Sequence, residues 1–374
     1  MALKIVREST RWDRTPEAAT KLVHQGLTRL GQTPEAVILL SSQEYNLPAM
    51  LPALRVLLGD VPVWGGTLRQ IFGEDGRPSR SLEVALLAGE GVKARARWFT
   101  DLEQAEPQAF FPGETSLLLT LLDAQLPRMP RWMRWLAQHQ GPLLGALVGN
   151  VAYMVPPLLC GGSRGGGGGA ALLALQGVRV HMAWGTGWGS SGLLTEVTES
   201  RAEWVSRLDG EPPAQRLAAW LGRSEREWTR PPLRELARLY PLAVEREGAF
   251  TFYAPLAVET DGGLRMSQPL RRGEKAHLMV GSAAECLEAA RRAAQQALEA
   301  FGAHRPQMAL LLVDWAWAHL FWAHPHDVYR AVQQVLGEGI PILGGYTYGP
   351  LARPAGEEEA PRVLDNHLLV ALLG

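Results

Sequence analysis

Polar and aromatic residues follow several short apolar runs, at positions where they can hydrogen-bond a small molecule. The run AVILL is followed by Ser41 and Ser42, and glycine pairs close the runs in VWGGT (63–67) and ILGGYTY (342–348). In open α/β sheets, ligands bind beyond the carboxyl ends of the strands, where backbone N–H groups and loop side chains converge. We therefore predict a small-ligand site formed by Ser41, Ser42, Gly65, Gly66, Thr67, Asp314, Trp315, Gly344, Gly345, Tyr346, Thr347 and Tyr348.

The same residues also have a purely structural interpretation. Glycine pairs permit a tight junction between a strand and a loop. Serine or aspartate at the end of a strand caps the helix that follows. Both interpretations stay open, because a glycine that the turn needs can also line a pocket.

The histidine-rich segment 319–327 is the most obvious candidate for metal binding. Zinc sites combine recognisable ligand spacings with a second cluster elsewhere in the chain, and none is recognisable here. Pro325 and Asp327 instead suit the start of a helix, with His326 or Asp327 near its cap. We therefore predict no metal ion at this segment.

The two glycine-rich segments do not indicate an enzyme, and none of the common catalytic motifs is recognisable in the sequence. The run SRGGGGG (163–169) lacks the lysine and hydroxyl residue that end a phosphate-binding loop, so we interpret it as a hairpin insert. We interpret WGTGWGSSG (184–192) as a surface loop. No nucleophile elbow, paired carboxylates or serine–histidine–aspartate set is recognisable. The sequence favours a binding protein over an enzyme, although triads are defined by space and not by order.

The bulk composition is that of a soluble globular protein. The 374 residues are 47% hydrophobic and 20% charged, with a formal net charge of −1, which gives no electrostatic footprint for nucleic acid or a membrane surface. The longest apolar run (143–160) is interrupted by a proline pair and is interpreted as core and loop. Cys160 and Cys286 have no redox or metal spacing, and the N-terminus lacks an apolar signal segment. We expect a cytoplasmic protein without nucleic-acid or membrane partners.

One unit recurs along the chain. Its first copy has a strand (34–42), a helix (48–59), a strand ending in two glycines (61–66), a turn-rich insert (72–79) and a final strand (81–89). The last copy repeats these features in order at 306–315, 326–337, 341–346, 352–361 and 367–374, and a weaker middle copy lies at 115–123, 129–140, 141–146, 163–169 and 170–177.

The repeat predicts the fold class. A helix that connects two short buried strands implies parallel pairing in a layered sheet, and the strand after the insert can return as a neighbour. We predict an α/β fold of layered mixed sheets, built from repeated strand–helix–strand–Gly-Gly units in two related halves.

Different material separates the middle and last copies. Residues 200–240 carry arginine, glutamate and tryptophan at helical spacing, whereas 241–280 alternates like strands, with a hairpin turn at Asp261. The run 282–301 is a predicted helix with Ser282 as its N-cap and Glu285 completing a capping box. The predicted domains are 15–198, a helical connector at 199–239, and 240–374.

The segments of the C-terminal part occur in the order of a known family. They are the PLAVE strand, the DGGL turn, the RRGEKAHLMV strand, the alanine-rich helix, IPILGGYTYG and NHLLVALLG. Through them, residues 240–374 resemble the FIST C-terminal domain. Residues 15–195 are similar to the FIST N-terminal domain through AVILLSS, VPVWGG and VALLAG.

The resemblance implies a sensory module of bacterial type that binds small ligands such as amino acids. No output domain is recognisable, so we expect a signalling partner protein in trans. No cofactor is predicted; the family's alternative is a haem-binding nitric-oxide sensor, for which the candidate histidines are His181, His319, His324, His326 and His367.

Two departures from the family concern the ligand. Pro350 stands where a glutamate commonly follows the aromatic–glycine pair, and Trp315 lies where a cysteine often ends the preceding strand. The family's ligand therefore does not transfer directly. An enzyme acting on a small polar metabolite, a scaffold without a ligand, and a homo-oligomer all stay open.

Overall fold

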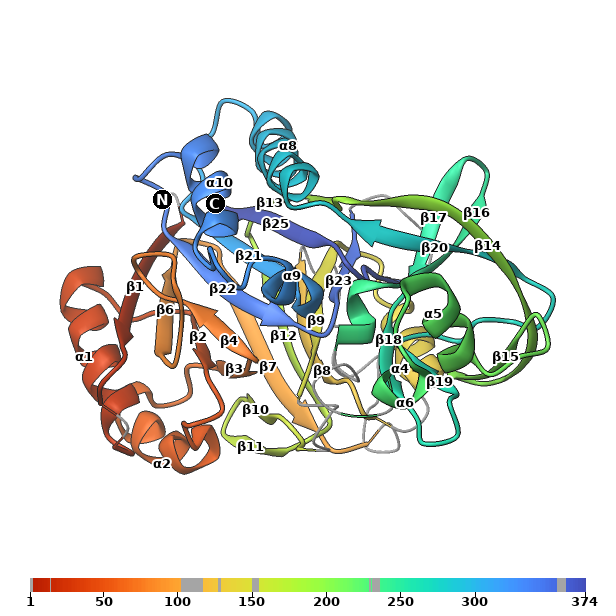
Figure 1. Ribbon diagram of the computed structural model, residues 1–374. Coiled ribbons are helices and arrows are strands. Elements are labelled where there is room, and N and C mark those ends of the chain that lie inside the picture. Colours follow the sequence, from red (N-terminus) through yellow and green to blue (C-terminus); the bar gives the residue numbers. More distant parts are fainter. Residues whose placement is uncertain are drawn as a thin grey trace.

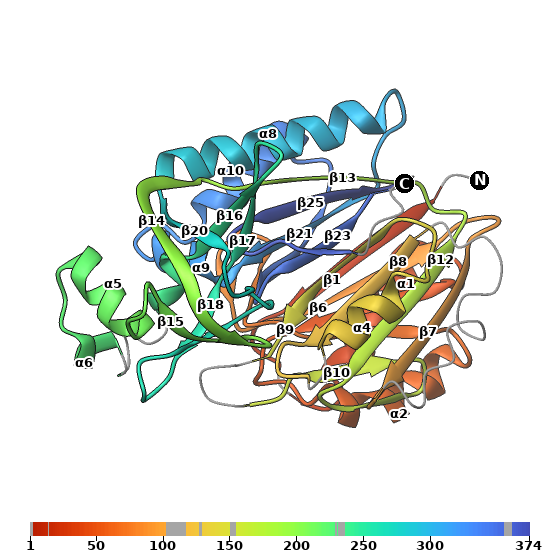
Figure 2. The ribbon, with the colours of Figure 1, turned by 90° about the vertical axis from the view of Figure 1, so that its right-hand side faces the viewer.

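The computed structural model describes residues 3–13, 15–101, 117–126, 129–149, 155–228, 230, 236–354 and 361–374. Three six-stranded sheets surround a common core, and a fourth sheet lies at one end of it (Figures 1 and 2). The predicted mixed α/β class is confirmed. Within the described residues, no helix is long and apolar enough to cross a membrane.

The three six-stranded sheets have the same strand order. In each, an outer antiparallel strand is followed by the last strand of a unit, then by two parallel strands, and then by a hairpin. The first sheet contains β1 (Lys4–Thr10), β6 (Leu82–Ala88), β2 (Ala36–Ser41), β3 (Val63–Thr67), β10 (Leu158–Gly161) and β11 (Arg164–Gly167). The second contains β7 (Lys93–Phe99), β12 (Ala170–Gln176), β8 (Leu117–Asp123), β9 (Leu143–Val148), β23 (Pro350–Arg353) and β24 (Arg362–Val363). The third contains β13 (Val180–Gly185), β25 (Leu368–Leu373), β21 (Met308–Asp314), β22 (Ile342–Thr347), β4 (Gln70–Phe72) and β5 (Pro78–Ser79).

Each sheet is completed by a hairpin from another part of the chain. We call residues 4–88 the first unit, 93–176 the second and 180–373 the third. The second unit's hairpin β10–β11 pairs with β3 of the first unit, and the third unit's hairpin β23–β24 pairs with β9 of the second. The first unit's hairpin β4–β5 pairs with β22 of the third. The three exchanges close a ring.

The inner faces of the three sheets form the central core in matching layers. Strands β2, β8 and β21 can be aligned because Leu39, Thr120 and Leu311 each pair with a glycine of the neighbouring parallel strand. Alternate side chains point inward. The aligned inner layers are Ala36, Leu117 and Met308; Ile38, Leu119 and Leu310; and Leu40, Leu121 and Leu312.

Helices cover the outer face of each sheet, as Figure 2 shows. The N-cap of α8 is Ser282, as predicted, and its hydroxyl accepts a hydrogen bond from the Glu285 N–H. The Ser282 N–H instead donates to the Gly187 carbonyl, so the predicted capping box is only half formed. The covering helices are α1 (Ala18–Leu30) and α2 (Leu47–Leu58) on the first sheet, α4 (Met129–Leu136) on the second, and α8 (Ala283–Phe301), α9 (Trp315–Leu320) and α10 (Asp327–Leu336) on the third.

The fourth sheet is inserted into the third unit between β13 and α8. The predicted hairpin turn at Asp261 is confirmed, between β18 and β19. The sheet contains β17 (Ala249–Tyr253), β16 (Leu242–Arg246), β20 (Lys275–Gly281), β14 (Trp188–Arg201), β15 (Trp204–Leu208), β19 (Leu264–Met266) and β18 (Pro255–Val258). The short helices α5 (Pro213–Leu221), α6 (Glu225–Trp228) and η3 (Ala237–Leu239) connect its strands.

Two local predictions for this region were wrong. The segment 184–192, predicted as a surface loop, lies mostly in β13 and β14. Its glycines fit because Gly185 and Gly187 lie against the backbone of α8, where a side chain would collide. The first part of the predicted helical connector is also strand, since β14 runs to Arg201 and β15 follows.

Candidate functional site

The core changes from apolar to polar at the carboxyl ends of β2, β8 and β21. Ser42, Asp123 and Asp314 occupy the next inward position after the last apolar layer, at one register position of the three units. Their exposed fractions are 2%, 7% and 0%. We call these three residues the polar layer. Buried polar groups need hydrogen-bond partners, so their contacts indicate what the layer can bind.

In the third unit, the chain itself neutralises the polar layer. The Arg238 guanidinium, carried by η3, forms an ion pair with Asp314 in which Nε donates to Oδ1 at 3.3 Å and Nη2 donates to Oδ2. Nη2 also donates to the Tyr348 carbonyl at 3.3 Å. Asp314 in turn accepts a hydrogen bond from the Ala316 N–H at 2.8 Å and so caps α9. Both ionic side chains are enclosed, which ties η3 firmly to the end of β21.

A second buried carboxylate, Asp365, lies beside this ion pair. One of its oxygens is 3.7 Å from Nη2 of Arg238. Its other oxygen accepts hydrogen bonds from the Ser267 hydroxyl and from the Gln268 side chain at 3.2 Å. Burial raises the pKa of Asp365 to about 7, an effect that Arg238 opposes and Asp314 reinforces. Asp365 is therefore the group of this cluster expected to change its charge near neutral pH.

Arg69 joins the first and third units at the same end of the core. Its Nη1 donates to the Tyr348 hydroxyl at 2.9 Å, and its guanidinium lies 4.5 Å from the centre of the Trp315 ring. The Arg69 N–H donates to the Tyr346 carbonyl at 3.1 Å. Arg69 and Trp315 are half-buried, so a cation and an aromatic face are partly open to solvent here.

Several buried polar atoms at this end have no hydrogen-bond partner in the described part of the chain. Those outside the cluster of Arg238 and Asp365 include the hydroxyl oxygens of Ser41, Ser42 and Tyr346 and the indole nitrogen of Trp315. Burial raises the pKa of the Tyr346 hydroxyl, which keeps it protonated and able to donate. An unsatisfied buried polar group costs about 1–3 kcal/mol. These atoms are therefore where a polar ligand would gain most.

The predicted glycines have structural roles. A Cβ on Gly65 or Gly344 would lie 1.7 or 1.9 Å from the carbonyl oxygen of the paired strand residue, and on Gly145, which was not predicted but has the same register position in the second unit, 1.9 Å. Gly66 and Gly345 lie against the donated strands β10 and β4. At Gly65, Gly344 and Gly345 the reason is the close approach of two backbones, whereas a Cβ on Gly66 would collide with the Leu159 side chain.

The two predicted threonines also act within the fold. Thr67 Oγ1 accepts a hydrogen bond from the Leu158 N–H at 3.0 Å and so holds the donated hairpin. Thr347 Oγ1 donates to the Val313 carbonyl at 3.3 Å. Pro350, one of the two departures from the family, begins the donated strand β23.

Sequence reasoning missed four charged residues of this region: Arg69, Asp123, Arg238 and Asp365. Arg238 lies 76 residues from Asp314, within an arginine-rich stretch that predicted only a solvated helix. A signal did exist for Asp123, because it ends the first strand of the middle copy, as Asp314 does in the last. The ligand role of the predicted residues stays a prediction.

A cavity of about 190 Å³ lies next to the polar layer, between the second unit and the fourth sheet. It is lined by the turn after β8 and by β15, β18 and β19, and Ser267 belongs to its wall. The lining residues are Ala124, Gln125, Leu126, Met129, Glu203, Trp204, Leu256, Arg265, Met266 and Ser267.

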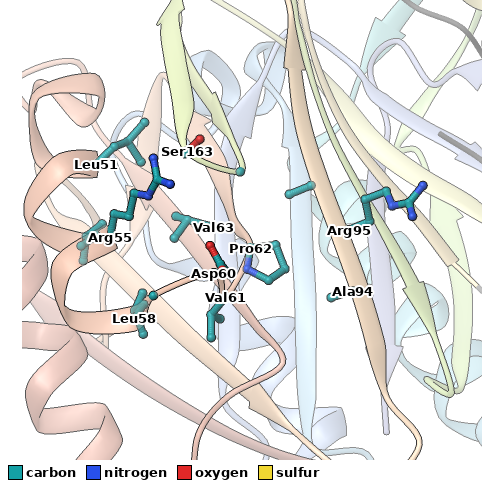
Figure 3. Close-up of a pocket in the computed structure, with 14 residues that line it drawn as sticks. Leu51, Arg55, Leu58, Asp60, Val61, Pro62, Val63, Ala94, Arg95 and Ser163 are labelled. Atoms are coloured by element: carbon teal, nitrogen blue, oxygen red, sulfur yellow. The ribbon is translucent and has the colours of Figure 1, made fainter. Parts of the chain in front are cut away.

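A larger cavity of about 250 Å³ lies beside the amino-terminal end of β3, between α2, β7 and the β10–β11 turn. Figure 3 shows Leu51, Leu58 and Val63 around it, whereas the side chain of Arg95 points away. None of the predicted site residues lines it. It is thus separate from the polar layer.

The histidines named as haem candidates lie in different local environments. Among the described residues, no three histidine, cysteine, aspartate or glutamate side chains are placed to hold a metal ion. His319 lies edge-on to Trp315, and His326 precedes α10 as its N-cap residue, as predicted. His367 is half-buried, with its ring edge-on to Phe252. Neither of the two cavities described above is lined by a histidine.

Comparison with known proteins assigns the family. Residues 35–211 match the FIST N domain and residues 213–353 match the FIST C domain. No functionally curated protein matches the sequence. Among solved structures, a cyanuric acid hydrolase from A. caulinodans is similar with 10% identity and a TM-score of 0.34, over 100% of this chain and 99% of that one. PurLQS from Thermotoga maritima is similar with 10% identity and a TM-score of 0.24, over 100% and 72%. Because the two domain matches cover most of the sequence, the chain belongs to the FIST family, whose domains are sensory domains that bind small ligands.

Proposed function

We propose that this protein is a sensory module whose small polar ligand, amino-acid-like or a related metabolite, binds at the polar layer. The observation that carries the proposal is that buried polar atoms of Ser41, Ser42, Trp315 and Tyr346, all near these strand ends, have no hydrogen-bond partner in the described part of the chain. A ligand that hydrogen-bonds them removes a standing cost of about 1–3 kcal/mol for each atom satisfied.

The neighbouring charges suit such a ligand. The half-buried Arg69 offers a guanidinium to a carboxylate, and its contacts with Trp315 and Tyr348 hold it in place. Aromatic rings and a few fixed polar groups are typical of small-molecule sites.

We expect a separate partner protein to receive the signal that ligand binding produces. The region joins residues of both family domains, since Ser42 and Arg69 belong to the FIST N match and Arg238 and Asp314 to the FIST C match. A ligand that moves Tyr348 also moves the carbonyl that accepts from Arg238, and η3 carries this change to the fourth sheet. We expect the partner to recognise that sheet.

A melting-temperature screen against amino acids and related metabolites tests the proposal. A ligand at one hundred times its Kd stabilises the native state by about 2.7 kcal/mol. Ser42→Ala should leave the free protein as stable as the wild type, because the hydroxyl has no partner, but should reduce the ligand-induced shift. Ser163→Ala, at the larger cavity, is the matched control and should retain the full shift. The proposal fails if no compound shifts the melting temperature of the wild type.

The enzyme alternative is separated by one further measurement. A sensor leaves its ligand chemically unchanged, whereas an enzyme consumes it. Product analysis after prolonged incubation of the stabilising compound with the protein therefore decides between them.

A further inference from the structure

Asp123 in the second unit repeats the local structure of Asp314 in the third. Each ends the first parallel strand of its unit at the same register position. Each accepts a hydrogen bond through Oδ1 from the N–H two residues on, at 2.9 Å for Asp123 and 2.8 Å for Asp314. Each lies near a glycine with φ of 125°, Gly149 or Gly349. The two carboxylates are therefore placed alike.

Among the described residues, only one of these two carboxylates has a cationic partner. Asp314 holds the guanidinium of Arg238, whereas no described lysine, arginine or histidine forms an ion pair with Asp123. Asp123 is only 7% exposed, and burial raises the pKa of its carboxyl group. A buried carboxylate without a cation is costly, and the third unit shows which group such a carboxylate takes in this fold.

We propose that Asp123 binds the guanidinium or ammonium group of the ligand, in the place that Arg238 occupies at Asp314. This inference rests on the proposed function and names its ligand class, an organic cation. The internal Arg238–Asp314 pair is the template for the contact, with two N–H groups directed at one carboxylate.

The adjacent cavity has room for the rest of such a ligand. Its wall begins at Ala124 and Gln125, directly after Asp123, and its volume of about 190 Å³ suits a short apolar chain. Leu256 and Met129 supply apolar surface, and the half-exposed Trp204 supplies an aromatic face.

The charges around the cavity also favour a cation. Glu203 lines it, and Asp365 lies behind Ser267. The cavity wall includes one arginine, Arg265, whose guanidinium lies 3.8 Å from Glu259 and 5.9 Å from the Trp204 ring. Its charge is thus already opposed by a carboxylate of the chain.

A pair of isosteric probes tests the inference by isothermal titration calorimetry on the full chain. n-Butylguanidinium and n-butylurea have the same shape, and only the first is charged. We expect the wild type to bind n-butylguanidinium at least tenfold more tightly than n-butylurea. Equal affinities, or no binding of n-butylguanidinium, would overturn the inference.

Substitutions test whether the preference for the charged probe depends on the Asp123 carboxylate. Asp123→Ser, which copies the first unit's residue Ser42, should remove the preference for the charged probe, and Asp123→Asn should do the same. Asp60→Asn, at the larger cavity, is the matched control and should keep the full preference. The ligand-free Asp123→Ser protein should melt at or above the wild-type temperature, because an unpaired buried charge is gone, and this second readout shows that the variant folds.

The outcomes separate the two proposals. If neutral metabolites stabilise the wild type and Ser42→Ala abolishes the effect, while Asp123→Ser has no effect on any ligand, the inference is wrong and the proposed function stands. If n-butylguanidinium binds through Asp123 and no natural metabolite shifts the melting temperature, the cation site stands and the sensory proposal fails.

Discussion

The first parallel strand of the second unit and that of the third unit both end in an aspartate, and the two aspartates lie in different environments. Asp314 is fully enclosed and paired with Arg238, while Asp123 is almost as buried but faces no described cation. The difference comes from the fourth sheet, because its connecting segment supplies Arg238 only to the third unit. The chain itself thus neutralises the aspartate of the third unit, whereas for the aspartate of the second unit we propose that a ligand supplies the cation.

The pairing at Asp314 fixes the fourth sheet in place more than it adds stability. Burying two charges removes them from water, and their attraction repays that cost only when the geometry is good. Removing one partner is nevertheless expensive, since the other charge stays buried. The comparison therefore predicts that substitutions around Asp314 and around Asp123 change the free energy of unfolding very differently.

The largest effect is expected for Arg238→Ala. The substitution leaves Asp314 and Asp365 buried without a cation, which should lower the free energy of unfolding by about 3–5 kcal/mol. Urea unfolding followed by circular dichroism measures it. A loss below about 1 kcal/mol would contradict a structural role for the pair.

Ser42→Asp gives the first unit the residue of the second. The new carboxylate replaces a side chain that is only 2% exposed, so burying its charge should lower the free energy of unfolding by about 2–3 kcal/mol at neutral pH. Ser42→Asn, which is close in size and uncharged, is the control and should cost less. If both variants are equally stable, the polar layer is more hydrated than its burial indicates.

The pH dependence of stability should reflect Asp365. Its carboxyl group keeps a proton up to about pH 7 in the folded protein, whereas the unfolded chain releases it near the ordinary value of 3.8. The folded state therefore binds the extra proton between these limits, and stability falls as pH rises from about 4 to 7, by at most about 1.4 kcal/mol per unit. Asp365→Asn should lack this component when melting temperatures are compared across the range. A difference between variant and wild type that does not change with pH would refute the shift.

The smallest change in stability is expected when a solvent-exposed ion pair is broken. Arg207 and Glu199 of the fourth sheet are 3.3 Å apart, and both are more than half exposed. Glu199→Gln should change the free energy of unfolding by less than about 1 kcal/mol, and added salt should reduce the change further. A larger loss would mean that burial does not explain the contrast with Arg238.

The sequence alone predicts most of the elements that build the polar layer. Apolar runs such as 34–42 and 306–315 are short, bounded by turn residues and buried on both faces, so their strands are recognisable. The alanine-rich run 282–301 has helical periodicity and a capping serine. Local patterns of this kind do not depend on the rest of the chain.

The charged contacts could not be predicted in the same way. Arg238 is one of several arginines at helical spacing, and only the position of η3 against β21 distinguishes it. The hairpins pair with sheets of other units, and no periodicity within a hairpin records which sheet receives it. The strand-end glycines were recognisable, but their reason, the close approach of two backbones, required the register.

The ring of exchanged hairpins affects how the protein folds while the ribosome synthesises it. Strand β4 is made early, yet its partner β22 follows near the other end of the chain. Pairings between such distant segments are slow to form, and unpaired strand edges aggregate. At a synthesis rate of about 5–20 residues per second, the hairpin waits on the order of tens of seconds for its sheet. Chaperone dependence during synthesis should therefore be strongest before β22 emerges.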